Sequence, residues 1–167
     1  MYKFILLFLL FHYHLLSSCA GSLFAATDNM GIASKQTKNH IDSLLTAADN
    51  IDHGPAIMLS LSERAHQLSE FNGYTYGMLH STYNIARAYF YQSKLQKSYQ
   101  ILDSLLTCME SDSIAVSKVI NYRVTRSKIY TLMAVIFQDL NDYKTSMQYY
   151  LRALELIDKP ALIMISD

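Results

Sequence analysis

The chain has 167 residues, of which 51% are hydrophobic and 17% are charged, and its 14 basic and 14 acidic residues leave no net charge when histidine is neutral. No basic stripe develops along it, which argues against nucleic acid as a target. Only two prolines and five glycines are present, and they fall where helices would begin or end, so the composition predicts an all-α chain.

Residues 1–19 predict a secretory signal. A short apolar run at residues 4–11 follows a single lysine and precedes small polar residues, and such a run is too short to span a bilayer. The segment Leu16-Ser17-Ser18-Cys19 resembles the box of bacterial lipoproteins, which implies acylation of Cys19 and an extracytoplasmic, membrane-tethered protein of the periplasm or outer membrane. Ordinary cleavage near Ala20 or Ala26, or an uncleaved anchor, is the alternative. Residues 20–38 are small and polar and predict a flexible tether.

A first pair of helices is predicted from residue 39 to about Phe71. Apolar residues at helical spacing run through residues 41–51 and 58–68. Pro55 suits the opening turn of the second helix, and Gly73 suits a position just past its end. This unit lacks aromatic positions that later units have, as is expected of a terminal repeat.

One pattern of helical side chains then occurs twice, 48 residues apart. Its spacing of i, i+3, i+4 and i+7 places each set on one face of a helix. The match extends upstream to a preceding helix, so each unit is predicted to be two antiparallel helices joined by a short polar connector. The paired positions are Ile85 and Met133, Ala86 and Ala134, Tyr89 and Phe137, Leu95 and Tyr143, Ser98 and Ser146, Tyr99 and Met147, Leu102 and Tyr150, Leu105 and Ala153, Leu106 and Leu154, and Met109 and Ile157.

The stretch from Ser127 to Pro160 resembles a tetratricopeptide repeat (TPR) over its full length, and residues 79–112 resemble it less closely because Leu105 stands where the family has a small residue. The resemblance implies a right-handed solenoid of αα-hairpins, about three of them, over residues 39–160. Small residues matter because they let paired helices approach closely. The positions that define the repeat, and that are expected in the core, are Ile85, Ala86, Tyr89, Ser98, Leu102, Tyr130, Ala134, Phe137, Tyr143, Ser146, Tyr150, Ala153 and Pro160.

Six helices follow from this pattern, with turns near residues 52–55, 72–75, 92–94, 110–112 and 141–142. The fifth helix is predicted to run from about Ser113 to Leu140, with a break near Tyr122 as the alternative. Ala153 is expected to be buried where the last two helices cross.

No catalytic constellation is found. The histidines are scattered, and glycine-rich phosphate loops, nucleophile elbows and paired cysteines at metal-ligand spacing are absent from the sequence. We therefore expect a non-enzymatic protein with no metal or cofactor. Once the leader is removed, Cys108 would be the only cysteine, and it is expected to be free and buried.

A partner-binding surface is expected on the first helix of each hairpin, because that helix lines the concave groove in TPR proteins. Tyrosine, phenylalanine and arginine dominate binding energy at interfaces. If the surface is used, Tyr83 and Arg87 should be substantially exposed; in the alternative, Tyr83, Phe90 and Tyr91 pack against the preceding hairpin. The candidate groove residues are His80, Tyr83, Arg87, Phe90, Tyr91, Lys128, Thr131, Val135 and Gln138.

The sequence thus predicts an extracytoplasmic, lipid-anchored TPR scaffold that binds a protein or peptide and contacts the membrane only through its anchor. Residues 161–167 are expected either to fold back as an apolar tail over the last hairpin or to mark a truncation. In the second case the chain would be the ligand-sensing part of a bacterial signal-transduction protein, a histidine kinase or a transcriptional regulator, without its output domain. This regulatory role is the alternative function.

Overall fold

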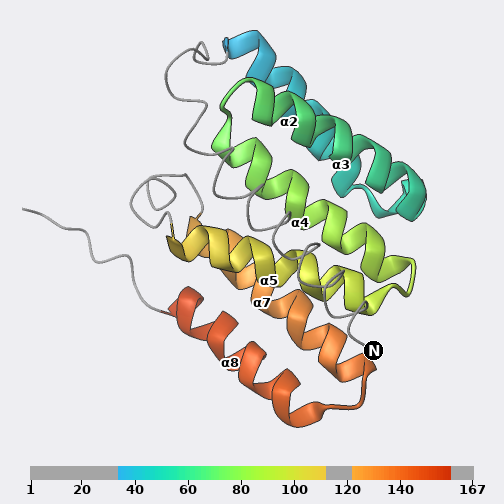
Figure 1. The fold of residues 1–167 in the computed structure, drawn as a ribbon, viewed down its shortest axis with the longest axis vertical. Helices are drawn as coiled ribbons and strands as arrows, with labels where there is room; N and C mark the ends of the chain where they lie inside the picture. Colours follow the sequence, from blue (N-terminus) through green and yellow to red (C-terminus); the bar gives the residue numbers. More distant parts are fainter. Residues whose placement is uncertain (1–33, 112–121, 159–167) are drawn as a thin grey trace, which may run out of the picture.

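The computed structural model describes residues 34–111 and 122–158, and these residues form six α-helices, one short 3₁₀ helix and no strand. The predicted all-α class is confirmed. In Figure 1 the helices follow one another along the long axis of the molecule, with α2 and α3 at one end and α8 at the other, and neighbours in this order pack together. The elements are α2 (Lys35–Asp49), η1 (Ile51–His53), α3 (Gly54–Phe71), α4 (Thr75–Tyr91), α5 (Leu95–Ser111), α7 (Tyr122–Asp139) and α8 (Tyr143–Asp158).

Three connections share one turn geometry. Gly73, Ser93 and Asn141 each have a positive φ, of 61°, 58° and 61°, at the middle of a three-residue connection. The next residue then donates its backbone N–H to a carbonyl five residues back, over 2.8 Å at Tyr74 and 2.9 Å at Lys94 and Asp142. This pattern satisfies carbonyl groups that the end of a helix leaves free and reverses the chain sharply. The turns predicted at residues 72–75, 92–94 and 141–142 are confirmed.

The start of the first helix differs from its prediction: residues 35–38, assigned to the flexible tether, form the first turn of α2, because the Ser34 side chain accepts a hydrogen bond from the Thr37 N–H and caps the helix there. The other predicted boundaries agree with the structure where it describes them. Gly54 (φ 75°) ends η1, and Pro55 stands in the first turn of α3, where its missing N–H costs no helical bond. The helix expected from Ser113 is described only from Tyr122 onward, as α7. The turn expected at residues 110–112, the tail at 161–167 and Pro160 lie wholly or partly outside the described residues.

Small residues lie where paired helices meet, as predicted. Ala86, Ser98, Ala134, Ser146 and Ala153 are all buried. The Ser98 hydroxyl donates to the Ala86 carbonyl across 2.8 Å, from α5 to α4. In the next pair, a hydroxyl on α7 donates to the Ala153 carbonyl on α8 across 3.2 Å. Contacts this short between a side chain and a neighbouring backbone need a small residue on each helix, so the expected position of Ala153 is confirmed.

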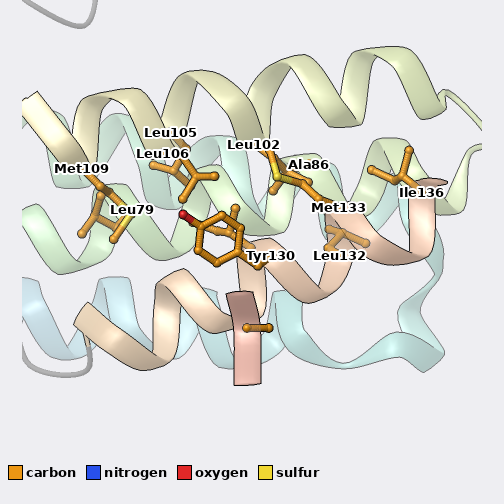
Figure 2. Packing of buried hydrophobic residues seen from close by; sticks show 12 residues of the cluster. Leu79, Ala86, Leu102, Leu105, Leu106, Met109, Tyr130, Leu132, Met133 and Ile136 are labelled. Carbon is orange, nitrogen blue, oxygen red and sulfur yellow. The ribbon is translucent and has the colours of Figure 1, made fainter. Parts of the chain in front are cut away.

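The main hydrophobic core lies between α4, α5, α7 and α8. Figure 2 shows side chains from α4, α5 and α7 converging in it, including Leu102, Leu105 and Met133. Leu105 is buried although it departs from the TPR pattern. A second, smaller cluster of Ile41, Leu45 and Ala65 joins α2 to α3.

A chain of aromatic rings ties α5, α7 and α8 together at the edge of the main core. Phe137 lies edge-on to Tyr99 at 5.4 Å between ring centroids and stacks on Tyr149 at 5.5 Å. Tyr149 also stacks on Tyr130 at 6.2 Å. Offset and edge-on pairs at these distances add stabilisation beyond the burial of their area.

Several positions expected in the core are not fully buried. Tyr143 and Tyr150 are exposed, so their assignment to the core is wrong. They lie on a side of α8 that no helix of the described residues covers, although the Tyr150 hydroxyl reaches Gln138 near the end of α7. Ile85, Tyr89 and Phe137 are half-buried, and the Tyr89 ring carries the Lys97 ammonium group 4.0 Å from its centroid.

Cys108 also differs from its prediction. It is half-buried on α5 and disulfide-bonded rather than free. Its side chain is only partly covered by neighbouring helices, so a second sulfur can reach it. The other cysteine of this bond lies outside the described residues.

Candidate partner-binding groove

The described surface is hollowed between α4 and α7. A hollow of about 440 Å³ opens between Tyr83 on α4 and Val124, Lys128 and Thr131 on α7. A smaller one of about 50 Å³ adjoins it and is lined further by Tyr76 and His80. We call these two hollows together the α4–α7 groove.

Helical spacing explains why these side chains line one groove. Tyr76, His80 and Tyr83 stand at i, i+4 and i+7 on α4, and Val124, Lys128 and Thr131 stand at the same spacing on α7. Residues so spaced lie on one face of a helix. Since α4 and α7 contact each other, their two stripes face a common space.

One end of the α4 stripe is held by a carboxylate from another helix. Asp49, at the end of α2, accepts hydrogen bonds from Asn84 at 2.9 Å and from the Arg87 guanidinium at 3.0 Å. His80 Nε2 lies 3.1 Å from the other carboxylate oxygen. Three side chains on one face of α4 therefore share a single acceptor 31 to 38 residues earlier in the chain.

This cluster shifts the ionisation of its members. Partial burial alone would raise the pKa of the Asp49 carboxyl, but the hydrogen bonds from His80 and Asn84 and the charge of Arg87 hold that pKa below its usual value. At Tyr83, burial raises the pKa of the phenol, and the nearby Arg87 charge opposes this only in part. Tyr83 is therefore a neutral hydrogen-bonding group near neutral pH.

The predicted groove residues fall into two groups. His80, Tyr83, Lys128 and Thr131 line the α4–α7 groove as expected. Arg87 does not line it: its guanidinium lies 5.7 Å from the centroid of the Tyr83 ring and is held by Asp49, and its side chain is only 17% exposed. The expectation that Arg87 would be substantially exposed is thus wrong, because the end of α2 supplies a partner for it.

The remaining candidates lie toward the far ends of α4 and α7 and line neither hollow. Phe90 packs against the main core and meets Tyr91 edge-on at 5.5 Å. Val135 is half-buried, and Gln138 is exposed and accepts a long hydrogen bond of 3.4 Å from Tyr150. Tyr83 and Phe90 pack against the main core, which includes α5 and α7.

Some lining residues were not predicted from the sequence. Tyr76 and Val124 extend the two stripes by one turn at the same spacing, so periodicity could have identified them. Ile157 reaches the groove from α8. The position of Ile157 in the groove depends on how α8 packs beside α7, just as the contacts of Asp49 depend on how α2 packs beside α4. The local sequence pattern does not predict either of these contacts.

The groove combines aromatic faces, hydroxyl groups and one exposed ammonium group, Lys128. Of these, tyrosine is among the residue types enriched at protein interfaces. Within residues 34–111 and 122–158, no group of three or more histidine, cysteine, aspartate or glutamate side chains is placed to hold a metal ion. In the same ranges, no helix is both long and apolar enough to cross a membrane.

Comparison with protein-family models, with curated proteins and with solved structures finds no match for this chain.

The Asp49 cluster predicts a pH dependence of stability. Because folding lowers the pKa of Asp49, its contribution is present above the pKa of the unfolded chain, near 4, and is lost as the pH falls through the folded value. The wild type should melt at a higher temperature than Asp49→Asn at pH 6, and this difference in melting temperature should become smaller below about pH 4. Asp52→Asn, an exposed change in the next turn, is the control. A gap that stays constant down to pH 3 would contradict a role for the ionised carboxylate.

Proposed function

We propose that the protein is a TPR-like scaffold whose three helix pairs form a right-handed solenoid and whose α4–α7 groove binds a segment of another protein. The observation that carries this proposal is the groove itself: two first helices of successive pairs face one open space lined by aromatic, hydroxyl and ammonium groups. The repeated turn geometry and the buried small residues support the repeat assignment.

The chemistry of the groove favours a particular ligand type. The Asp49 carboxylate is paired with the Arg87 guanidinium, so Lys128 is left as the exposed charge of the lining. Tyr76, Tyr83 and Val124 offer apolar contact area beside it. We infer a peptide segment that pairs an apolar side chain with an acidic one, since the first fills the hollow and the second reaches the ammonium group.

Selection of a phage-displayed peptide library against the protein tests this function. Peptides enriched on the wild type should be acidic and apolar, and Lys128→Glu should weaken their binding about tenfold, because a charge-assisted hydrogen bond is lost and a like charge is introduced. Arg64→Glu is the matched control, a charge reversal on α3 outside the groove. Equal binding by both variants would refute the groove as the binding site.

We also propose that the protein is extracytoplasmic and anchored through a lipid on Cys19. The basis is the resemblance to a lipoprotein box in residues 16–19, beside an apolar leader. In the intact cell, Cys19→Ser should abolish incorporation of labelled fatty acid and move the protein from the membrane fraction to the soluble fraction.

A lipid on Cys19 and a disulfide within one chain exclude each other, because the chain has only two cysteines and a sulfur that carries a lipid cannot also form a disulfide. The control for this test is therefore Cys108→Ser, which removes any such disulfide. It should leave both labelling and fractionation unchanged. Membrane association of Cys19→Ser without label would instead indicate an uncleaved signal anchor.

A further inference from the structure

Helix α8 has two apolar faces, and among residues 34–111 and 122–158 only one of them is covered by other helices. Its inner face places Ser146, Tyr149, Ala153 and Leu156 against α7 and the main core. Beside it, about 100° around the helix, runs a second set of large apolar side chains that are exposed, which we call the α8 outer face. Its members are Tyr143, Met147, Tyr150, Leu151, Leu154 and Ile157.

The repeat shows what such a face contacts elsewhere in the molecule. On α5 the equivalent positions Leu102, Leu106 and Met109 are 0%, 8% and 0% exposed, because they lie in the core that α7 closes. On α8 their counterparts Tyr150, Leu154 and Ile157 are 36%, 51% and 67% exposed. Met147, Tyr150, Leu154 and Ile157 also keep the alternating three- and four-residue spacing of a seam between two helices. The α8 outer face thus has the form of a helix-packing surface.

Its size matches a protein interface. With about 200 Å² for a large side chain, the exposed fractions amount to roughly 600 Å² of contiguous apolar surface. That is at the upper end of what soluble monomers expose, and a standard interface buries about 800 Å² on each partner. A contact between two such faces with a modest polar rim would reach this size.

We propose that the α8 outer face binds the same face of a second copy of this chain, with the two α8 helices antiparallel. In a two-fold pair each face is its own complement. Tyr150 and Leu151 stand at the middle of α8 and would lie at the axis, and Met147 would then lie opposite Leu154 of the second copy. None of its six side chains is charged, and the exposed Lys144 and Glu155 stand beside Leu151 at the edge of the face, where they can stay hydrated.

The test compares copies of the full chain that carry two different affinity tags. Both are co-expressed, extracted in mild detergent and purified through one tag, and recovery of the other tag is measured. The wild type should co-purify and should sediment as a dimer. Met147→Glu combined with Leu154→Glu should lower the recovery about tenfold or more, because charges are buried at the centre of the contact in both copies. Ile157 is left unchanged because it also lines the α4–α7 groove.

Gln148→Glu, a charge added to the exposed polar side of the same helix, is the matched control and should retain the wild-type recovery. All variants should keep the wild-type helical content, because the substituted side chains are exposed in the single chain. Full recovery by the double variant would overturn the proposal, and so would sedimentation of the wild type as a monomer. If the wild type is a monomer and Leu162→Glu lowers its melting temperature, the face is instead covered by residues 159–167 of the same chain.

Discussion

Leu106→Ala should lower the free energy of unfolding by about 2–5 kcal/mol. Leu106 is 8% exposed in the core between α4, α5 and α7, where truncating a leucine removes apolar contact area and leaves a cavity. Chemical denaturation followed by circular dichroism measures the change. The loss should appear at the midpoint and not in the slope of the transition, since the unfolded chain is hardly altered.

Leu154→Ala is the matched control, because Leu154 is the same residue at the equivalent position of the next unit. It is 51% exposed in the single chain, so the same truncation should change stability by no more than about 0.5 kcal/mol. Both variants should be measured at protein concentrations where the chain is monomeric, because a dimer through α8 would add its own contribution. Equal losses at the two positions would mean that the outer side of α8 is buried within one chain.

Ala153→Trp should destabilise the fold by about 1–3 kcal/mol or more, because Ala153 lies where α8 crosses α7 and its carbonyl accepts a hydrogen bond from Ser127. An indole cannot enter this site unless the helices separate, and the hydrogen bond is then lost. Thermal unfolding should show a clearly lower midpoint.

The control for overpacking is Gln148→Trp, which adds the same ring to the exposed side of α8. It should leave the midpoint close to that of the wild type. If Ala153→Trp melts like the wild type, Ala153 does not lie at a close contact between α7 and α8, because an indole ring fits there only if the two helices are already apart.

The helices and turns could be predicted because their causes are local. Ala86, Ser98 and Ala134 are each buried on the face that the residue spacing of their own helix predicts. This spacing extends over a few consecutive turns, so it can be recognised without knowing which helix packs on that face. Similarly, the turn after α3 is marked by Gly73, whose φ of 61° is adopted most readily by glycine. Ser93 and Asn141 adopt the same conformation in short polar connectors, which the sequence also marks as turns.

The candidate site could be predicted only in part. The periodicity placed His80, Tyr83, Lys128 and Thr131 on the correct faces of their helices, and the structure brings them together in one groove. It could not show that Arg87 is already bound by a carboxylate. The residue spacing of a helix face is the same whether its side chains are exposed to solvent or contact a neighbouring helix, so spacing alone does not predict exposure.

By itself, then, the sequence determined which residues are helical, where the chain turns and which small residues lie between helices, because each depends on dihedral preferences and spacing within a few turns. Only the tertiary structure decided that Asp49 binds Arg87 across 38 residues, and that Ile157 joins the groove. It also decided that Leu106 is buried while its counterpart Leu154 is exposed. The physical reason is that burial and charge pairing depend on which helix lies next to a face, and equivalent faces acquire different environments when, within the described part of the chain, a helix packs on one and not on the other.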